Sequence, residues 1–462
     1  MTSLHQPDAS TDAATVSAAS ATFEQLRQAV GENAPTDEQL TAHFAPVFAA
    51  IAAGSDQREQ DHTLAFDAIE LLRQSGFTRV RLSHERGGIG ASLPQLALLL
   101  VDLAAADSNL PQALHGHYMF TEQHEAESQG EVSDWWIGQV AEGKIFGNAL
   151  VELPPSAGKR PVIWTPVDPA AAPAAEGPTP LAHITGDKFY STGALFADYL
   201  LVTATQPGQN GDDDAVYFTI VDATDPGVRR IDDWSGFGQR LTASGTTTFD
   251  DVPVYPHRLQ EFDTPTGVLA YTVLWIVLAA TQTGIGQNAL HQITQFVRER
   301  RRTYNHAAAE TPAQDPLVHE VIGAVSAKVS VARFAVAGAA AVAEKSFRAV
   351  GGHTDLEDPV VIQAHTEANI ALSETTAVVS ELILQATNQI FESGGASAVD
   401  TGKNLHRHWL NARTIASHTP LIYRVQAVGN YRINGITPPF HSTARNSDPN
   451  AAAAAAQTTQ GA

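Results

Sequence analysis

The chain has no cysteine among its 462 residues. This absence excludes disulfide bonds, zinc or iron–sulfur sites built on cysteine, and a thiol nucleophile. The first twenty residues also lack the basic segment and the apolar core of a secretory signal, and we interpret residues 1–20 as a disordered leader. Both absences favour a cytoplasmic protein.

Long apolar runs and positive charge are scarce as well. The longest apolar stretch, Val268–Ala280, contains Tyr271, Thr272 and Trp275 and falls short of a membrane span, so we interpret it as a buried helix. Acidic residues outnumber lysine and arginine by 50 to 28, which leaves a formal net charge of -22. Because nucleic-acid binding needs a positive face, we expect a small-molecule ligand, no nucleic acid and no membrane.

Acidic residues are absent between Asp400 and Asp448, in a chain that is otherwise rich in them. This segment contains Lys403, Arg407, Arg413, Arg424, Arg432 and Arg445, together with His406, His408, His418 and His441. Two interpretations are open: the segment binds an anion, or its cations pair with carboxylates elsewhere in the chain. Composition alone favours the second.

The spacing of apolar residues changes twice along the chain and predicts an α+β protein. Residues 21–145 have helical spacing, with Thr36 and Gln39 as a capping box, and residues 146–262 have short strands with turns between them. Residues 263–440 return to long helical patterns, and residues 441–462 form a low-complexity tail. The strands are expected at Phe146–Val151, His183–Ile184, Tyr199–Thr203, Ala215–Val221 and Thr246–Phe249, with a loop at Lys159–Pro180; the long helices are expected at Val268–Asn305, Pro316–Ala349 and Pro359–Phe391.

Several short segments occur in an order that resembles the acyl-CoA dehydrogenase superfamily of flavoproteins. They are Glu85–Gly90, Lys188–Gly193, Gly236–Gly245, Arg298–Arg302 and Gly394–Gly395, and the resemblance extends over roughly residues 22–440. It implies an N-terminal helical domain, a middle β-barrel or sandwich domain, and a C-terminal four-helix bundle. It also implies a homotetramer formed through that bundle.

One departure from the dehydrogenases changes the expected reaction. Removal of an α-proton from an acyl thioester needs a carboxylate base over the flavin ring. Asn411–Pro420 occupies the usual position of this base, no glutamate follows Glu392, and the alternative position, on the helix that begins near Val268, has no carboxylate either. These segments instead resemble the monooxygenase branch of the superfamily, which includes dibenzothiophene monooxygenases and sulfur-acquisition oxidoreductases. The segments that carry this second resemblance are Phe146–Ala149, Ile231–Trp234, His408–Arg413, His418–Pro420 and Val428–Gly435.

Membership of that branch implies a two-component, reduced-flavin-dependent monooxygenase. Such enzymes receive reduced FMN from a separate NAD(P)H-dependent flavin reductase, react with O2 through a C4a-hydroperoxyflavin, and oxygenate a hydrophobic small molecule that is sulfur-containing or heteroaromatic. The chain has no G-x-G-x-x-G segment, so nothing indicates that it binds NAD(P)H itself. FAD is the alternative flavin. The alternative functions are an acyl-CoA dehydrogenase or oxidase with a displaced base, and a non-enzymatic flavin-binding scaffold.

The resemblance also implies a set of site residues. His418, Asn148, Thr192 and His117 are the expected catalytic residues, with His418 as a proton donor or hydrogen-bonding group because imidazole titrates near neutrality. The expected flavin-binding residues are Asn148, Ser191, Thr192, Trp234 and Arg302, with Gly394, Gly395 and Ser397 meeting the flavin phosphate of a neighbouring subunit. The other arginines of Arg298–Arg302 are expected on a solvated face or in ion pairs.

Three positions differ from the residues that are usual in the branch. One pair of histidines has a second interpretation, as metal ligands. Ile415 stands where a second histidine is common, Thr419 where an aspartate is usual, and Gly116 offers no phenol beside His117. The alternative for His117 is an ordinary buried histidine. We expect no metal at His406-x-His408, because residues two apart on a helix point in different directions.

Overall fold

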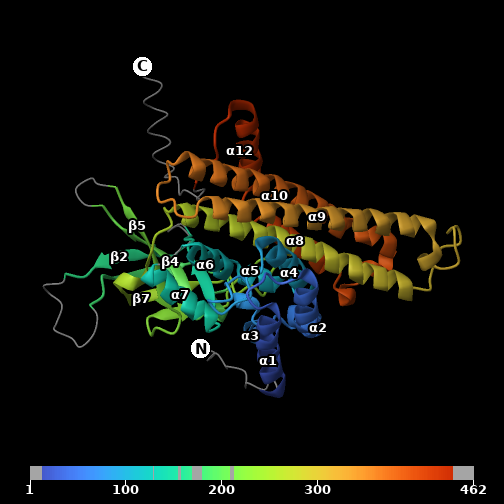
Figure 1. Ribbon diagram of the computed structural model, residues 1–462. Helices are drawn as coiled ribbons and strands as arrows, with labels where there is room; N and C mark the ends of the chain where they lie inside the picture. The colour runs from blue at the N-terminus through green and yellow to red at the C-terminus, as the bar shows by residue number, and fades with distance from the viewer. Residues whose placement is uncertain (1–12, 128–129, 154–157, 169–178, 209–212, 441–462) are drawn as a thin grey trace.

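The computed structural model describes residues 13–127, 130–153, 158–168, 179–208 and 213–440. The N-terminal helices and the sheet lie side by side, and the three longest helices of the C-terminal part extend across them (Figure 1). Helices, a sheet and a helical bundle follow one another along the chain, which confirms the predicted α+β class.

The N-terminal part is helical, as predicted. Its helices are α1 (Ala13–Val30), α2 (Asp37–Asp61), α3 (Phe66–Gln74), α4 (Leu93–Ala106), α5 (Asn109–Ala113), α6 (His115–Ala126) and α7 (Glu131–Ala141). The capping box at Thr36 and Gln39 is present, with bonds of 3.2 Å and 2.9 Å. The predicted leader is too long, because residues 13–20 already belong to α1; this alanine-rich stretch has high helix propensity. Residues 1–12 lie outside the described part.

The middle part is one sheet with strand order β6-β7-β3-β2-β4-β5-β8, and β1 pairs with β4 in parallel. Its strands are β1 (Phe146–Ala149), β2 (Ile163–Pro166), β3 (Ala182–Lys188), β4 (Tyr199–Gln206), β5 (Ala215–Asp222), β6 (Val228–Arg230), β7 (Thr247–Val254) and β8 (Leu259–Gln260). The prediction of a loop over Lys159–Pro180 was wrong where β2 lies. Pairing with β3 and the stacking of Trp164 on Tyr217, 4.4 Å between ring centroids, hold a strand that its proline-rich surroundings conceal.

The C-terminal part contains α8 (Pro265–Glu299), α9 (Pro316–Ala349), α10 (Pro359–Gly394), α11 (His406–Ala416) and α12 (Leu421–Asn434). The three long helices each begin with proline at the first position, after a Thr or Asp that caps the helix. Val268–Ala280 is a largely buried part of α8, as predicted, and α8 packs against α4, α6, α9 and α10.

The two longest apolar helices differ in their burial. Both α8 and α9 are long and apolar enough to cross a membrane by length and composition alone. The most apolar window of α8 is 83% buried inside the protein, whereas that of α9 is only 22% buried. The structure therefore explains the apolar character of α8 by core packing and leaves a large apolar face of α9 exposed.

Candidate active site

His115, Asn148 and His418 meet where the helical parts join the sheet. Asn148 lies in β1, His115 begins α6, and His418 follows α11. The amide nitrogen Nδ2 of Asn148 is 2.5 Å from Nε2 of His115, and the rings of His115 and His418 are 5.9 Å apart in an edge-on arrangement. Two of the predicted catalytic residues, Asn148 and His418, are thus brought together through a histidine that the sequence did not single out.

The hydrogen bonds of His115 define its protonation. Its Nδ1 is 2.6 Å from the carbonyl oxygen of Gln112, which can only accept, so Nδ1 carries the proton. Burial lowers the pKa of His115 to about 4, so the ring is neutral at pH 7 and its Nε2 is an acceptor. Asn148 therefore donates one amide hydrogen to His115 and keeps its second amide hydrogen and its carbonyl oxygen for other partners.

His418 is the solvent-facing member of this group. Surrounding protein, and then the neighbouring His115, lower the pKa of His418, although the residue keeps an exposed surface that weakens this effect. No carboxylate contributes to the lowered pKa of His115 or of His418. His418 is therefore a neutral imidazole at pH 7, better suited to hydrogen bonding and proton relay than to service as a preformed imidazolium acid.

The structure places His117 away from this group. His117 is fully buried, its Nε2 lies 2.7 Å from the carbonyl oxygen of Thr78, and its ring stacks on Phe146. Residues two apart on a helix point about 200° apart, so only one of His115 and His117 can face Asn148. The hydrogen bond between Asn148 and His115 shows that His115 is the one that does.

A cluster of hydroxyl groups adjoins Asn148 on the sheet. Thr192 Oγ1 lies 2.8 Å from Ser244 Oγ, and the backbone N–H of Asn148 donates to the Thr192 carbonyl at 3.2 Å. Ser191 Oγ is buried and has no hydrogen-bond partner among the described residues. A buried hydroxyl without a partner costs free energy unless a ligand supplies one. The polar edge of a flavin ring fits this place on that ground, since it carries both donors and acceptors.

Trp234 stands beside the same loop. Its indole N–H donates to the carbonyl oxygen of Gln239 at 2.9 Å, and its ring centroid is 5.8 Å from that of Tyr190. Gly236 lies against the indole so closely that any Cβ would overlap the ring, which explains the glycine there. The indole is thus held in one orientation, as a residue that flanks a flat ligand must be.

The predicted phosphate-binding residues lie at the far end of the bundle. Arg302 and Ser397 are exposed, and Gly395 has φ of +56°. Gly394 is held by Arg300, whose Nη1 donates to its carbonyl oxygen at 2.5 Å. The structure therefore gives Arg300 a contact with a backbone carbonyl, in place of the solvated face or ion pair that was predicted.

The cations of the carboxylate-free segment have different partners. Arg407 forms an ion pair with Asp56, and Arg432 pairs with Glu374 at 2.9 Å. Arg413 donates to Ser417 Oγ at 3.1 Å. Pairing with carboxylates elsewhere is therefore the correct interpretation for two of these arginines, and Arg424 has no such partner among the described residues.

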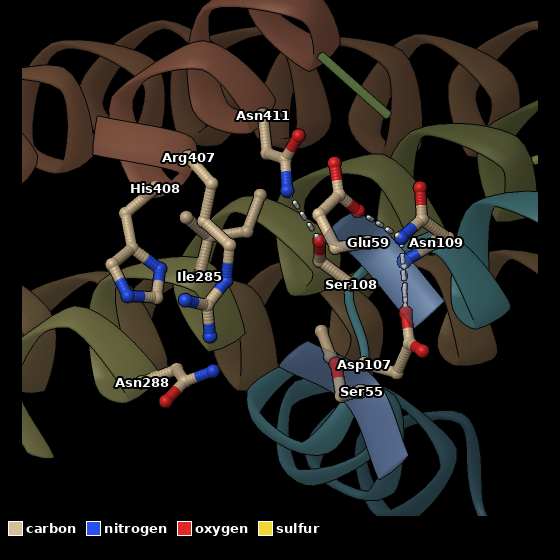
Figure 2. Close-up of a pocket in the computed structure, with 11 residues that line it drawn as sticks. Ser55, Glu59, Asp107, Ser108, Asn109, Ile285, Asn288, Arg407, His408 and Asn411 are labelled. Atoms are coloured by element: carbon tan, nitrogen blue, oxygen red, sulfur yellow. Dashed lines mark hydrogen bonds between the residues drawn. The ribbon is translucent and has the colours of Figure 1, made fainter. Parts of the chain in front are cut away.

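A polar cavity lies at the junction of α2, α4, α8 and α11 (Figure 2). Its charged walls are already satisfied: Arg58 pairs with Asp107 at 3.0 Å, and Asn109 donates to Glu59 at 3.3 Å. We interpret this network as a junction between domains. His408 bonds Gln292 at 2.9 Å, and the described residues contain no group of three or more His, Asp or Glu side chains that could hold a metal ion.

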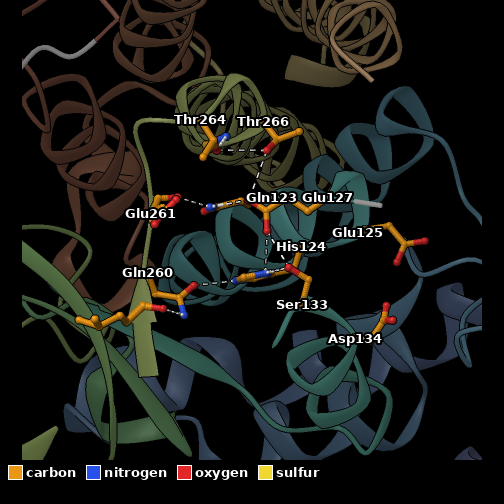
Figure 3. Close-up of polar contacts among 12 residues, drawn as sticks. Gln123, His124, Glu125, Glu127, Ser133, Asp134, Gln260, Glu261, Thr264 and Thr266 are labelled. Atoms are coloured by element: carbon orange, nitrogen blue, oxygen red, sulfur yellow. Dashed lines mark hydrogen bonds and ion pairs between the residues drawn. The ribbon is translucent and has the colours of Figure 1, made fainter. Parts of the chain in front are cut away.

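A second polar network fixes α6 to its neighbours (Figure 3). His124 Nε2 lies 2.8 Å from Gln260 Oε1, its Nδ1 lies 2.9 Å from Ser133 Oγ, and Ser133 donates to Glu127 at 2.7 Å. Burial alone would raise the pKa of Glu127, but hydrogen bonds and the charge of His124 hold it below its ordinary value. His124 Nδ1 also lies 3.2 Å from Glu127 Oε2. Because the serine donates its proton to the carboxylate and not to the imidazole, this is no nucleophilic triad. It joins α6 and α7 to β8.

Comparison with known proteins supports the same interpretation of the fold. Residues 276–422 match the family described as "Acyl-CoA dehydrogenase, C-terminal domain". The chain is 26% identical over 388 residues to a dibenzothiophene monooxygenase of Mycolicibacterium goodii, with 82% of this chain and 89% of the relative covered. It is 24% identical to a probable FMNH2-dependent monooxygenase, SfnC, of Pseudomonas putida, with 86% and 95% covered.

Among solved structures, the chain is similar to FMN-bound TdsC from Paenibacillus sp. A11-2. The TM-score is 0.74 at 24% sequence identity, and the match covers 87% of this chain and 99% of the other. The predicted arrangement of a helical domain, a β domain and a helical bundle is thereby confirmed. The resemblance to the monooxygenase branch, inferred from short segments, is confirmed by relatives that align over most of the chain.

Proposed function

We propose that this chain, which has the acyl-CoA dehydrogenase fold, is the oxygenating component of a two-component, reduced-flavin-dependent monooxygenase. Its substrate is a hydrophobic small molecule that is sulfur-containing or heteroaromatic. The observation that carries the proposal is the group of two neutral imidazoles and an amide, His115, His418 and Asn148. Among the described residues, no carboxylate contacts this group to act as the base of a dehydrogenase. The names of the aligned relatives support FMN and a sulfur compound.

Three groups of residues would hold the flavin. Asn148 and the hydroxyls of Ser191 and Thr192 would meet the polar edge of its ring, and Trp234 would flank the ring. When bound there, reduced FMN supplies the two electrons that activate O2. The overall reaction balances as FMNH2 plus O2 plus substrate giving FMN, water and a substrate with one added oxygen.

The protein contributes hydrogen bonds, proton transfer and exclusion of water. Asn148, held by His115, presents one amide hydrogen and one carbonyl oxygen in a fixed orientation. His418 relays the proton for the departing water, since its ring can release a proton from one nitrogen while the other receives one from solvent. The fully buried Phe146 and Phe120, which stack at 4.1 Å between centroids, belong to the apolar packing behind β1 and keep water from that side.

The remaining partners follow from this function. A separate NAD(P)H-dependent flavin reductase would deliver reduced FMN by diffusion, and both proteins would be cytoplasmic. We further propose a homotetramer formed through the C-terminal bundle, in which Arg302 of one subunit and Gly394–Ser397 of another meet the flavin phosphate.

The exposed apolar side chains of two C-terminal helices support this assembly. Leu317 and Phe334 of α9 are 66% and 75% exposed, and Ile422 and Ile433 of α12 are 71% and 82% exposed. Light scattering that finds a monomer with normal FMN affinity would contradict the assembly and leave the chemistry untouched.

The function is tested by adding purified protein to a flavin reductase, NADH, FMN and O2 with a panel of sulfides, sulfones and indole. We expect one added oxygen in at least one product, dependent on both proteins. Tightly bound FAD that an acyl-CoA bleaches without a reductase would instead support the dehydrogenase alternative. Flavin binding with no turnover in either assay would indicate a scaffold.

A further inference from the structure

Arg424, in the first turn of α12, is a cation without an anionic partner among the described residues. Its guanidinium carbon lies 3.5 Å from the centroid of the Trp275 ring, and its Nη2 donates to Ser373 Oγ at 3.1 Å. Its Nε is buried and has no hydrogen-bond partner among the described residues. Burial lowers the pKa of Arg424 to about 10, so the side chain keeps its charge at neutral pH.

The surroundings of Arg424 differ from those of other arginines nearby. Arg432, two turns later on the same helix, pairs with Glu374 at the surface, and Arg407 on α11 pairs with Asp56. Withdrawing a guanidinium from water without a counter-charge is unfavourable, and stacking on one indole and one hydroxyl contact replace only part of its hydration. The remaining donors are available to an anion that the protein itself does not supply.

The register of the helices places Arg424 level with the candidate active site. Glu127, just after α6, accepts a hydrogen bond from Thr266 near the start of α8 (Figure 3), whereas Ser108, before α5, lines the same cavity as Ile285 far along α8 (Figure 2). The chain from 108 to 127 therefore runs antiparallel to α8 with a constant offset. By this offset His115 is level with residue 278 of α8, within one turn, or about 5 Å, of Trp275.

The connection between α11 and α12 brings the two places close together. His418 touches His115, and Arg424 follows His418 by six residues, of which the last four form the first turn of α12. Three extended residues followed by one helical turn place the Cα atoms of His418 and Arg424 at most about 15 Å apart. A separation of this size is within the length of a small aromatic or aliphatic molecule that carries an anionic group.

We propose that Arg424 binds an anionic group of the substrate, so that this enzyme oxygenates an organic acid whose apolar body carries the reacting atom. This inference rests on the proposed function and names the substrate class more closely. The carboxylate or sulfonate bonds the Nε and Nη donors of Arg424 beside Trp275, and the apolar body points toward His115 and Asn148. Arg424 is therefore a specificity-determining residue and takes no part in proton transfer.

The test compares an acid with its uncharged isostere. The reactive pair is 4-(methylthio)benzoate and 4-(methylthio)benzamide, in which the sulfur is distant from the group that changes. The matching sulfones, which have no lone pair on sulfur to oxygenate, serve as binding probes in calorimetry without flavin turnover. Wild type, Arg424→Gln, Arg424→Lys and the control Arg432→Gln are compared, since Arg432 lies on the same helix but is paired at the surface.

Wild type is expected to prefer the acid over the amide in both kcat/KM and Kd. Arg424→Gln should remove this preference by weakening the acid on the order of 10- to 100-fold while leaving the amide unchanged. Arg424→Lys should restore part of it, and Arg432→Gln should leave it intact.

Two other results overturn the inference. One is a wild type that binds the acid no better than the amide. The other is an Arg424→Gln variant that binds both probes more weakly by the same factor, as expected if Arg424 only stabilises the position of α12. Failure of the proposed function has a different signature. If neither sulfide is oxygenated but the acid sulfone still binds in an Arg424-dependent way, the site stands and the reaction assigned to it does not.

Discussion

His115 and His117 lie two residues apart on α6, and we expect substitutions of the two to have opposite effects on kcat. His117→Gln is the more informative change. Nε2 of His117 donates to the Thr78 carbonyl, and a glutamine amide reaches the same position with a nitrogen that does not titrate. Burial lowers the pKa of His117 to about 4, against 6.5 for a histidine in an unfolded chain. The unfolded state therefore binds a proton more readily, and stability is lost as the pH falls from above 6.5 toward 4.

The size of this loss follows from the two pKa values. For one group with a folded pKa of about 4, the free energy of unfolding falls by about 2 kcal/mol between pH 7.5 and pH 5, and by about 3 kcal/mol when the pH passes below both values. Urea unfolding of wild type and His117→Gln at both pH values measures it. The variant should lose about 2 kcal/mol less than wild type between pH 7.5 and 5.

The control is His115→Asn, which keeps a donor for the Gln112 carbonyl but removes the Nε2 that accepts from Asn148. His117→Gln should retain near wild-type kcat at pH 7.5, whereas His115→Asn should lose about 100-fold. Equal acid sensitivity of wild type and His117→Gln would refute the assignment of His117 to the core. If His117→Gln folds normally but loses most of its kcat, His117 belongs to the active site after all.

Three other changes test the site and its support. Asn148→Ala should reduce kcat about 100-fold, and product formed per NADH consumed should fall; unchanged coupling would remove Asn148 from the site. Because the variant leaves the buried Nε2 of His115 without its donor, the free energy of unfolding should also fall by about 1–3 kcal/mol. Ser191→Ala deletes a buried hydroxyl that has no partner among the described residues, so the free energy of unfolding should stay unchanged or rise. FMN binding, measured by fluorescence titration, should weaken about 5- to 10-fold. Unchanged FMN affinity would contradict the flavin placement. Gly193→Ala adds a Cβ that overlaps the Ala113 carbonyl oxygen at φ of +77°, and should cost 2 kcal/mol or more, about the range for such strain, in urea unfolding; a neutral effect would mean that this close approach is not rigid.

Much of the architecture was predictable because it depends on local signals. The apolar spacing predicts the long helices, and the structure places one at Pro316–Ala349, as predicted. Strands were less predictable because they depend on partners distant in sequence: β2 needs β3 and the Tyr217 ring. Strands as short as β6 and β8 contain too few residues to display alternation.

The resemblance predicts members of the candidate site, but the sequence does not predict their geometry. Asn148, His418 and the Ser191–Thr192 pair came from resemblance, and the structure brings Asn148 and His418 together around His115. His115 and His117 are the same residue type in the same segment. Only the rotation of α6 about its axis, relative to β1, determines which of them faces Asn148. The lowered pKa values of these histidines depend on burial, which no short motif reports.

The most direct test of the central claim is the origin of the oxygen in the product. The protein is incubated with the flavin reductase, NADH, FMN and a sulfide under 18O2 in ordinary water, and the product is analysed by mass spectrometry. The account predicts a sulfoxide that carries one 18O atom and forms only when both the reductase and this protein are present. Product oxygen derived from water, or oxidation of an acyl-CoA by a bound flavin without O2 incorporation, would contradict it.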